Sequence, residues 1–81
     1  PQGVAIRLDG QRAYTYDAAA GGVLTFDITG NPDPDVYVPL TAAVPLVGDP
    51  GPGVKMAITP DQRTLLIAGT TQLVIQPAPT N

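Results

Sequence analysis

The sequence predicts an all-β fold, and three observations support this prediction. The 81-residue chain contains nine glycines and ten prolines, which favour turns and disfavour helices. Apolar and polar residues alternate with a period of two in several short stretches, as they do in half-buried strands. Hydrophobic residues make up 43% of the chain and charged residues 14%, a composition that excludes intrinsic disorder.

Three strands are expected in the first part of the chain. Residues 4–8, 12–17 and 23–28 each alternate between two faces. Asp9-Gly10-Gln11 is a turn signal between the first two strands, and an Ala- and Gly-rich break separates the second from the third. The third strand carries apolar residues on both faces near its start, which indicates a strand that is covered on two sides.

The remaining strands are interrupted by two loops rich in Pro and Gly. After a loop at residues 29–35, a fourth extended segment is expected at 36–46, and its two prolines favour the edge of a sheet. A second loop spans residues 47–53. Three further strands are expected, at 54–59, 63–68 and 72–76, and the last residues contain two prolines that suit a tail leaving the fold.

The opening pattern recurs after the second loop. Val4–Asp9 aligns with Met56–Asp61 at an offset of 52 residues. Arg12–Tyr16 then aligns with Arg63–Ile67 if the second turn is one residue shorter. A repeat of about fifty residues built from short antiparallel strands is typical of the blades of a β-propeller.

These observations predict two four-stranded-type antiparallel blades of a β-propeller. The first blade is expected at residues 1–46, the Pro/Gly loop at 47–53, and a second blade without its outer strand, followed by the Pro-rich tail, at 54–81. The alternative is a self-contained, seven-stranded β-sandwich of immunoglobulin-like size. Two blades alone would expose apolar sheet faces, which usually mark an interface.

The segments Gly3–Tyr14 and Gly22–Asp27 resemble the YVTN-type repeat of bacterial surface and lactonase-like β-propellers. That repeat has an apolar strand, a Ser-Pro-Asp-Gly-like turn, a Tyr-Val strand and a third strand that ends in Asp. Ala57–Leu65 is similar to the same turn, with Gln62 where the family usually has Gly. The first copy departs from the family at Leu8, where Pro is expected.

The resemblance implies a secreted, cell-surface or periplasmic scaffold that binds a protein or a glycan. It also implies that the last blade can take its outer strand from the other end of the polypeptide. Pro1 stands in place of an initiator Met, so the chain is expected to be a fragment whose remaining blades lie upstream or in another chain. Because the family includes enzymes, the alternative is a set of non-catalytic blades in a lactonase-like hydrolase or a cofactor-dependent dehydrogenase.

The composition restricts the chemistry that this chain can perform. It contains no His, Cys, Glu or Trp, so it has no imidazole base, no thiolate nucleophile and none of the usual soft ligands for zinc, copper or iron. We therefore assign no catalytic residue and expect no cofactor. The net charge is −3, with four basic residues and no basic stripe, so nucleic acid and anionic membranes are not expected partners. The apolar stretches are too short to insert across a bilayer.

Two groups of polar residues are candidate sites. Asp33, Asp35 and Asp49 lie in the two loops and have carboxylates that a hard cation such as Ca²⁺ would accept as ligands, although solvated turn residues are the alternative that we favour. The second group is expected to be structural and to stabilise the repeated turn. Its aspartates accept backbone hydrogen bonds and its arginines cap the turn or contact the next blade. It comprises Asp9, Gly10, Arg12, Asp61 and Arg63.

Overall fold

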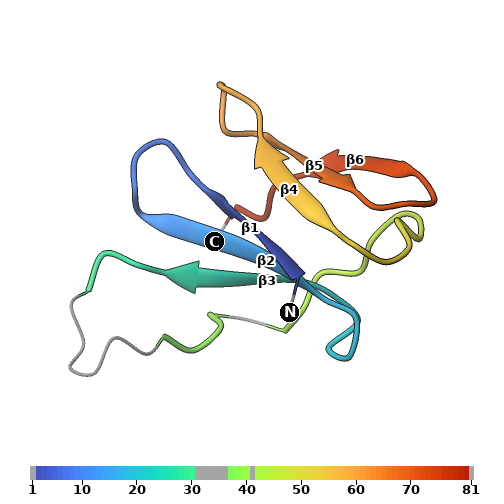
Figure 1. The fold of residues 1–81 in the computed structure, drawn as a ribbon. Coiled ribbons are helices and arrows are strands. Elements are labelled where there is room, and N and C mark those ends of the chain that lie inside the picture. Colours follow the sequence, from blue (N-terminus) through green and yellow to red (C-terminus); the bar gives the residue numbers. More distant parts are fainter. Residues whose placement is uncertain (1, 31–36, 41, 81) are drawn as a thin grey trace.

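The computed structural model describes residues 2–30, 37–40 and 42–80, and it contains two three-stranded antiparallel sheets (Figure 1). No helix occurs among the described residues, so the prediction of an all-β fold is confirmed. The strands of the N-terminal sheet, in spatial order, are β1 (Gln2–Ile6), β2 (Arg12–Asp17) and β3 (Gly22–Asp27). Those of the C-terminal sheet are β4 (Lys55–Ile58), β5 (Thr64–Ala68) and β6 (Leu73–Pro77).

The expected fourth strand at residues 36–46 is wrong. The described part of this segment meets β3 through two isolated antiparallel bridges, Val23 with Val44 and Phe26 with Pro39. Proline explains the difference, because a residue without an N–H group cannot continue the hydrogen-bond ladder. The described chain therefore has six strands, and neither a four-stranded first blade nor a seven-stranded sandwich is present in it.

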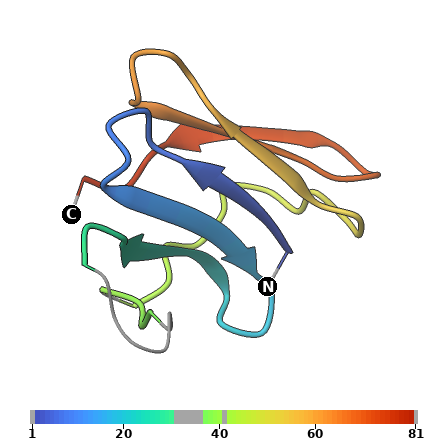
Figure 2. The same ribbon diagram turned by 60° about the vertical axis from the view of Figure 1, so that its left-hand side comes forward.

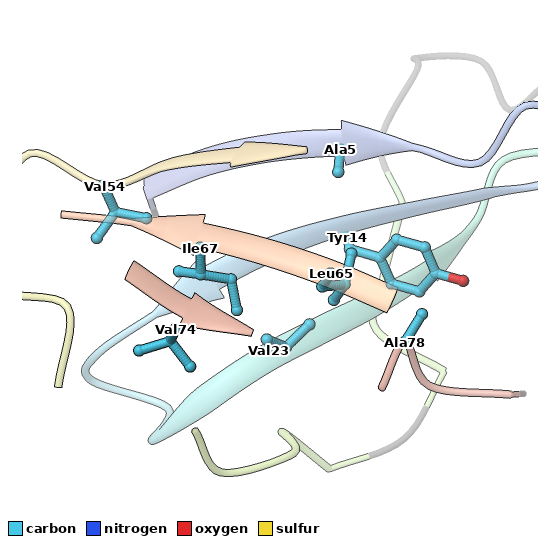
Figure 3. Close-up of a cluster of buried hydrophobic side chains, with 8 residues drawn as sticks. All are labelled: Ala5, Tyr14, Val23, Val54, Leu65, Ile67, Val74 and Ala78. Atoms are coloured by element: carbon cyan, nitrogen blue, oxygen red, sulfur yellow. The ribbon is translucent and has the colours of Figure 1, made fainter. Parts of the chain in front are cut away.

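The two sheets lie as layers (Figure 2), and the buried hydrophobic side chains lie between them (Figure 3). Strand β1 lies beside β4, and Tyr14 on β2 is fully buried against the C-terminal sheet. Burial of large apolar side chains in this layer contributes about 1.5–3 kcal/mol for each side chain. The buried hydrophobic cluster consists of Ala5, Tyr14, Val23, Val54, Leu65, Ile67, Val74 and Ala78.

The connector between the sheets is held by one buried amide side chain. Gln76 on β6 is only 5% exposed. Its Oε1 accepts a hydrogen bond from the Val47 backbone N–H at 2.9 Å, and its Nε2 donates to the Pro45 carbonyl at 3.4 Å. Further along, the Pro50 carbonyl accepts a hydrogen bond from the Thr71 backbone N–H at 2.9 Å. These contacts fix the connector against the C-terminal sheet.

Equivalent backbone hydrogen bonds close the first turn of each sheet. The Arg7 N–H donates to the Arg12 carbonyl at 2.9 Å, and the Thr59 N–H donates to the Thr64 carbonyl at the same distance. Both pairs are related by an offset of 52 residues. The two turns therefore have the same length, and the alignment of Arg12 with Arg63 is wrong. Arg12 corresponds to Thr64.

The equivalence continues into the third strand of each sheet. The Ile28 N–H donates to the Gln11 carbonyl at 3.2 Å, and the Ala78 N–H donates to the Arg63 carbonyl at 2.8 Å. Arg63 thus corresponds to Gln11, at an offset of 52, whereas Ala78 corresponds to Ile28, at an offset of 50. The offset changes because the β2–β3 ladder continues by one residue pair, Asp17 with Gly22, beyond the pair that corresponds to Ala68 with Leu73. The two sheets are structural repeats.

Candidate functional site

The turns β1–β2 and β4–β5 lie side by side at one end of the two sheets. The Asp9 backbone N–H donates to Gln62 Oε1 at 3.2 Å, which links the turns directly. Within the first turn, Asp9 Oδ1 accepts a hydrogen bond from the Gln11 N–H at 2.9 Å. Within the second, Asp61 Oδ1 accepts one from the Arg63 N–H at 3.0 Å. Both aspartates thus form Asx-type turns.

The same turns share a backbone conformation that favours glycine. Gly10 has a φ of 72°, and Gln62, which occupies the corresponding position, has a φ of 64°. The left-handed region carries a steric cost for a residue with a Cβ atom. The Gln62 side chain accepts a hydrogen bond from the neighbouring turn, and a glycine at this position could not make this contact.

The two arginines of the predicted turn group make different contacts. Arg12 Nη1 lies 3.4 Å from Asp27 Oδ1 and donates a hydrogen bond to the Gln11 carbonyl at 2.8 Å. Arg63 is exposed, and its backbone N–H and carbonyl make the turn contacts given above. A second ion pair joins Arg7 Nε to Asp9 Oδ2 at 2.9 Å. These contacts hold the turns, and they leave the side chains at the surface.

Hydrogen bonds lower the pKa of three carboxyl groups at this end of the molecule. The Arg7 side chain, and then the Gln11 N–H, lower the pKa of Asp9 from its ordinary value of 3.8. The Thr59 hydroxyl, and then the Arg63 N–H, lower the pKa of Asp61. The side chain and backbone of Thr29 do the same for the pKa of Asp27.

The lowered pKa values predict a loss of stability in acid. A carboxyl group whose pKa is lower in the folded chain stabilises the fold at pH values above the unfolded pKa, and this contribution is lost as the pH falls through the folded value. We therefore expect the melting temperature to fall as the pH drops below about 3.8. Thermal melts followed by circular dichroism measure this effect. The double variant Asp9→Asn, Asp61→Asn keeps the hydrogen-bond acceptors but does not titrate at these positions, so it should lose less stability. An equal loss would contradict the assignment.

The structure describes only one of the three loop aspartates that are candidate metal ligands. Asp33 and Asp35 lie outside the described residues. Asp49 is exposed, and its Oδ1 accepts a hydrogen bond from the Gly51 N–H at 2.9 Å. In the described ranges, no cluster of three acidic, His or Cys side chains occurs and no pocket is found. No described helix has the length and apolar character needed to cross a membrane.

Each of the two sheets has an apolar outer face. We call the sides that meet in the core the inner faces, and the opposite sides the N-terminal and C-terminal outer faces. Side chains alternate between the two sides of a strand, so the register assigns the paired residues to faces. A bulge interrupts the register of β1 between Gln2 and Ala5, and Val4, which precedes the buried Ala5, lies on the outer side. The N-terminal outer face consists of Val4, Ile6, Ala13, Thr15, Leu24 and Phe26, of which Ala13 is only 8% exposed. The C-terminal outer face consists of Lys55, Ala57, Leu66, Ala68, Leu73 and Ile75.

Both outer faces leave large apolar side chains in contact with solvent. Val4 is 61% exposed and Ile6 is 48% exposed on the N-terminal outer face. On the C-terminal outer face, Leu73 is 54% exposed and Ile75 is 56% exposed. Contiguous apolar surfaces of this kind mark interaction sites more often than isolated exposed residues do.

Equivalent residues of the two repeats lie on opposite faces of their sheets. Where one faces the core, the other faces outward. Ala5 is buried between the sheets, but the corresponding Ala57 lies on the C-terminal outer face and is exposed. Conversely, Val4 lies on the N-terminal outer face, whereas the corresponding Met56 packs against the core. The sheets therefore meet head to tail, through two different faces of the same repeat.

Several residues that organise these surfaces were missed in the sequence. Gln62 and Gln76 each link two segments through a side-chain amide. Gly22 and Gly69 allow the connector to pass close to the sheets. Gln76 directly follows the apolar residues 73–75, which indicated a buried polar contact. Nothing in the sequence indicated its partner.

Comparisons with known proteins provide no relative for this chain. No protein-family model, no curated protein and no solved structure matches it.

Proposed function

We propose that the two sheets are consecutive blades of a larger β-propeller, and that the chain is a structural module that presents its turns to a protein or glycan ligand. One observation carries this proposal: the two repeats meet head to tail and each leaves an apolar face uncovered. A stack of this kind has no natural end at two sheets. Further sheets would cover Val4 and Ile6 on one side and Leu73 and Ile75 on the other.

The paired turns supply a surface for the ligand. Asp9 and Gln62 hold the two turns together, so their exposed polar groups form one continuous edge. Arg7 and Arg63 contribute positive charge beside the carboxylates of Asp9 and Asp61. Such a mixture of charged and amide groups recognises the hydroxyl groups of a glycan or the polar groups of a protein surface.

Substitution of the C-terminal outer face tests the proposal. We expect the purified wild-type chain to self-associate as its concentration rises, because the apolar faces are uncovered. In the double variant Leu73→Thr, Ile75→Thr, association should weaken about tenfold or more, since roughly 1.4 kcal/mol of lost apolar burial corresponds to a factor of ten. Threonine retains the preference for strands. Light scattering measures the mass, and circular dichroism checks that the sheets remain.

The matched control is Val47→Thr, which removes an exposed apolar side chain of the connector, 78% exposed, away from the sheet faces. It should leave association unchanged. A wild-type chain that stays monomeric at every concentration and melts cooperatively would contradict the proposal, because its outer faces would then need no cover.

A further inference from the structure

We propose that a second copy of this chain covers the outer faces, with the C-terminal outer face of one copy packed on the N-terminal outer face of the next. The inference rests on the proposed function and specifies the partner surface. The contact is heterologous, so each copy uses one face to bind and offers the other face to a further copy. In the isolated chain, such copies take the place of additional blades.

The internal interface between the two sheets provides the template. Its N-terminal side consists of Ala5, Tyr14, Tyr16, Val23 and Thr25, and the corresponding residues of the second repeat are Ala57, Leu66, Ala68, Leu73 and Ile75. These corresponding residues make up the C-terminal outer face, apart from Lys55. The C-terminal outer face is thus the second repeat's counterpart of the N-terminal inner face, and no part of the described chain covers it.

The opposite side of the internal interface is repeated in the same way. Its C-terminal side includes Met56, Ile58, Leu65, Ile67 and Val74, and the corresponding residues of the first repeat are Val4, Ile6, Ala13, Thr15 and Leu24. The last five lie on the N-terminal outer face. The two uncovered faces are therefore counterparts of the two faces that already pack together.

One close approach within the chain identifies which residues would meet between copies. A Cβ atom at Gly3 would lie 3.0 Å from Met56 Cγ and 3.3 Å from the Met56 backbone nitrogen. Gly3 lies in a bulge of β1, next to Gln2, which pairs with Tyr16 as Lys55 pairs with Ala68. Lys55 therefore corresponds to Gln2, the neighbour of Gly3, and Val4 corresponds to Met56. Lys55 of one copy is therefore expected beside Val4 of the next, where the shorter valine leaves more room than methionine does.

The contact between copies should be weaker than the internal one. In the middle strand, Leu66 replaces Tyr14, and Ala13 replaces Leu65, so smaller side chains meet there. Lys55 also places a charged side chain at the position of Gln2, whose Oε1 accepts a hydrogen bond from the Val54 backbone N–H at 3.0 Å within the chain. We expect reversible association that increases with concentration, and not a permanently closed assembly.

Disulfide trapping tests the orientation, because the wild-type chain contains no cysteine. The variants Val4→Cys and Lys55→Cys are prepared separately, one of them isotopically labelled, and then mixed and oxidised. Both substituted residues are exposed, and circular dichroism verifies that each variant keeps the sheets. We expect the mixed disulfide to predominate, and we expect little dimer when either variant is oxidised alone. As a control, Leu8→Cys replaces an exposed residue of the β1–β2 turn, outside both faces, and should not pair with Lys55→Cys.

Other outcomes overturn the inference in distinguishable ways. Predominant dimers of a single variant would indicate that like faces pair, and efficient pairing of Leu8→Cys would indicate non-specific contact. Either result rejects the orientation but leaves the proposed function standing. A wild-type chain that remains monomeric in light scattering at every concentration rejects both.

Complementation provides a second test that does not depend on disulfide geometry. The variant Val4→Asp, Ile6→Asp blocks the N-terminal outer face, and Leu73→Asp, Ile75→Asp blocks the C-terminal outer face. Each variant alone should lose association. A mixture of the two should form dimers and nothing larger, because one intact face of each kind remains. A monomeric mixture of folded variants would contradict head-to-tail pairing.

Discussion

Replacement of Tyr14 by alanine is expected to unfold the chain. Tyr14 is fully buried between the two sheets, and its hydroxyl donates a hydrogen bond to the Pro79 carbonyl at 3.4 Å. Loss of a buried aromatic ring costs about 3–5 kcal/mol, and a core in a domain of this size supplies about the same amount of stability. Circular dichroism should show the loss of a cooperative thermal transition.

Two variants control for this result. Tyr14→Phe removes only the long hydrogen bond to Pro79 and should cost about 0.5–1.5 kcal/mol, so it should still melt cooperatively. Tyr37→Ala removes a half-buried ring of the connector, whose hydroxyl donates to the Gly30 carbonyl at 3.1 Å, and should leave the sheets in place. A Tyr14→Ala chain that melts like the wild type would show that the two sheets do not depend on a shared core.

Alanine at Gly22 is expected to detach the connector from β3. A Cβ atom there would overlap the Val44 carbonyl and lie 2.9 Å from Pro45 Cα, and all of these atoms belong to the backbone. The connector would have to move, which breaks the two hydrogen bonds between Val23 and Val44, at 2.8 and 2.9 Å. Two lost hydrogen bonds and the overpacking together cost about 2–5 kcal/mol.

Hydrogen exchange at the Val23 and Val44 amides measures this effect directly, and both should lose protection. Gly69→Ala should release the connector at its other end, since a Cβ atom there would overlap the Pro50 carbonyl. The control is Gly30→Ala, because a Cβ atom at Gly30 would meet nothing within 4 Å. If Gly22→Ala and Gly30→Ala had the same stability and exchange, the connector would not lie where the structure places it.

The strands could be predicted because their alternation is local. Residues 12–17 form a strand with the expected bounds, and the other five strands lie within two residues of their expected positions. The segment at 36–46 could not be placed in this way. Its apolar composition suits a strand, but Pro39 and Pro45 restrict its described part to isolated bridges, and only the position of β3 determines which residues meet.

The repeat was visible in the sequence, but its alignment was not. Arg12 and Arg63 are identical residues, so the sequence alignment matched them. The hydrogen-bond pattern instead matches Arg12 with Thr64. The backbone of the turn depends on the left-handed residue and on the aspartate before it, and these occur at Asp9-Gly10 and at Asp61-Gln62. The corrected alignment is what places equivalent residues on opposite faces, so the head-to-tail arrangement could not be derived without the structure.

Thiol labelling of two equivalent alanines tests the head-to-tail arrangement most directly. Ala5→Cys and Ala57→Cys are compared in a background that carries Leu73→Thr and Ile75→Thr, at a concentration where light scattering shows single chains. Because Ala5 is 5% exposed between the sheets and Ala57 lies on the outer face, the account predicts rapid labelling at position 57 and protection at position 5 until the chain is unfolded. Equal protection of both cysteines would mean that the repeats face each other through the same side, and that would contradict the account.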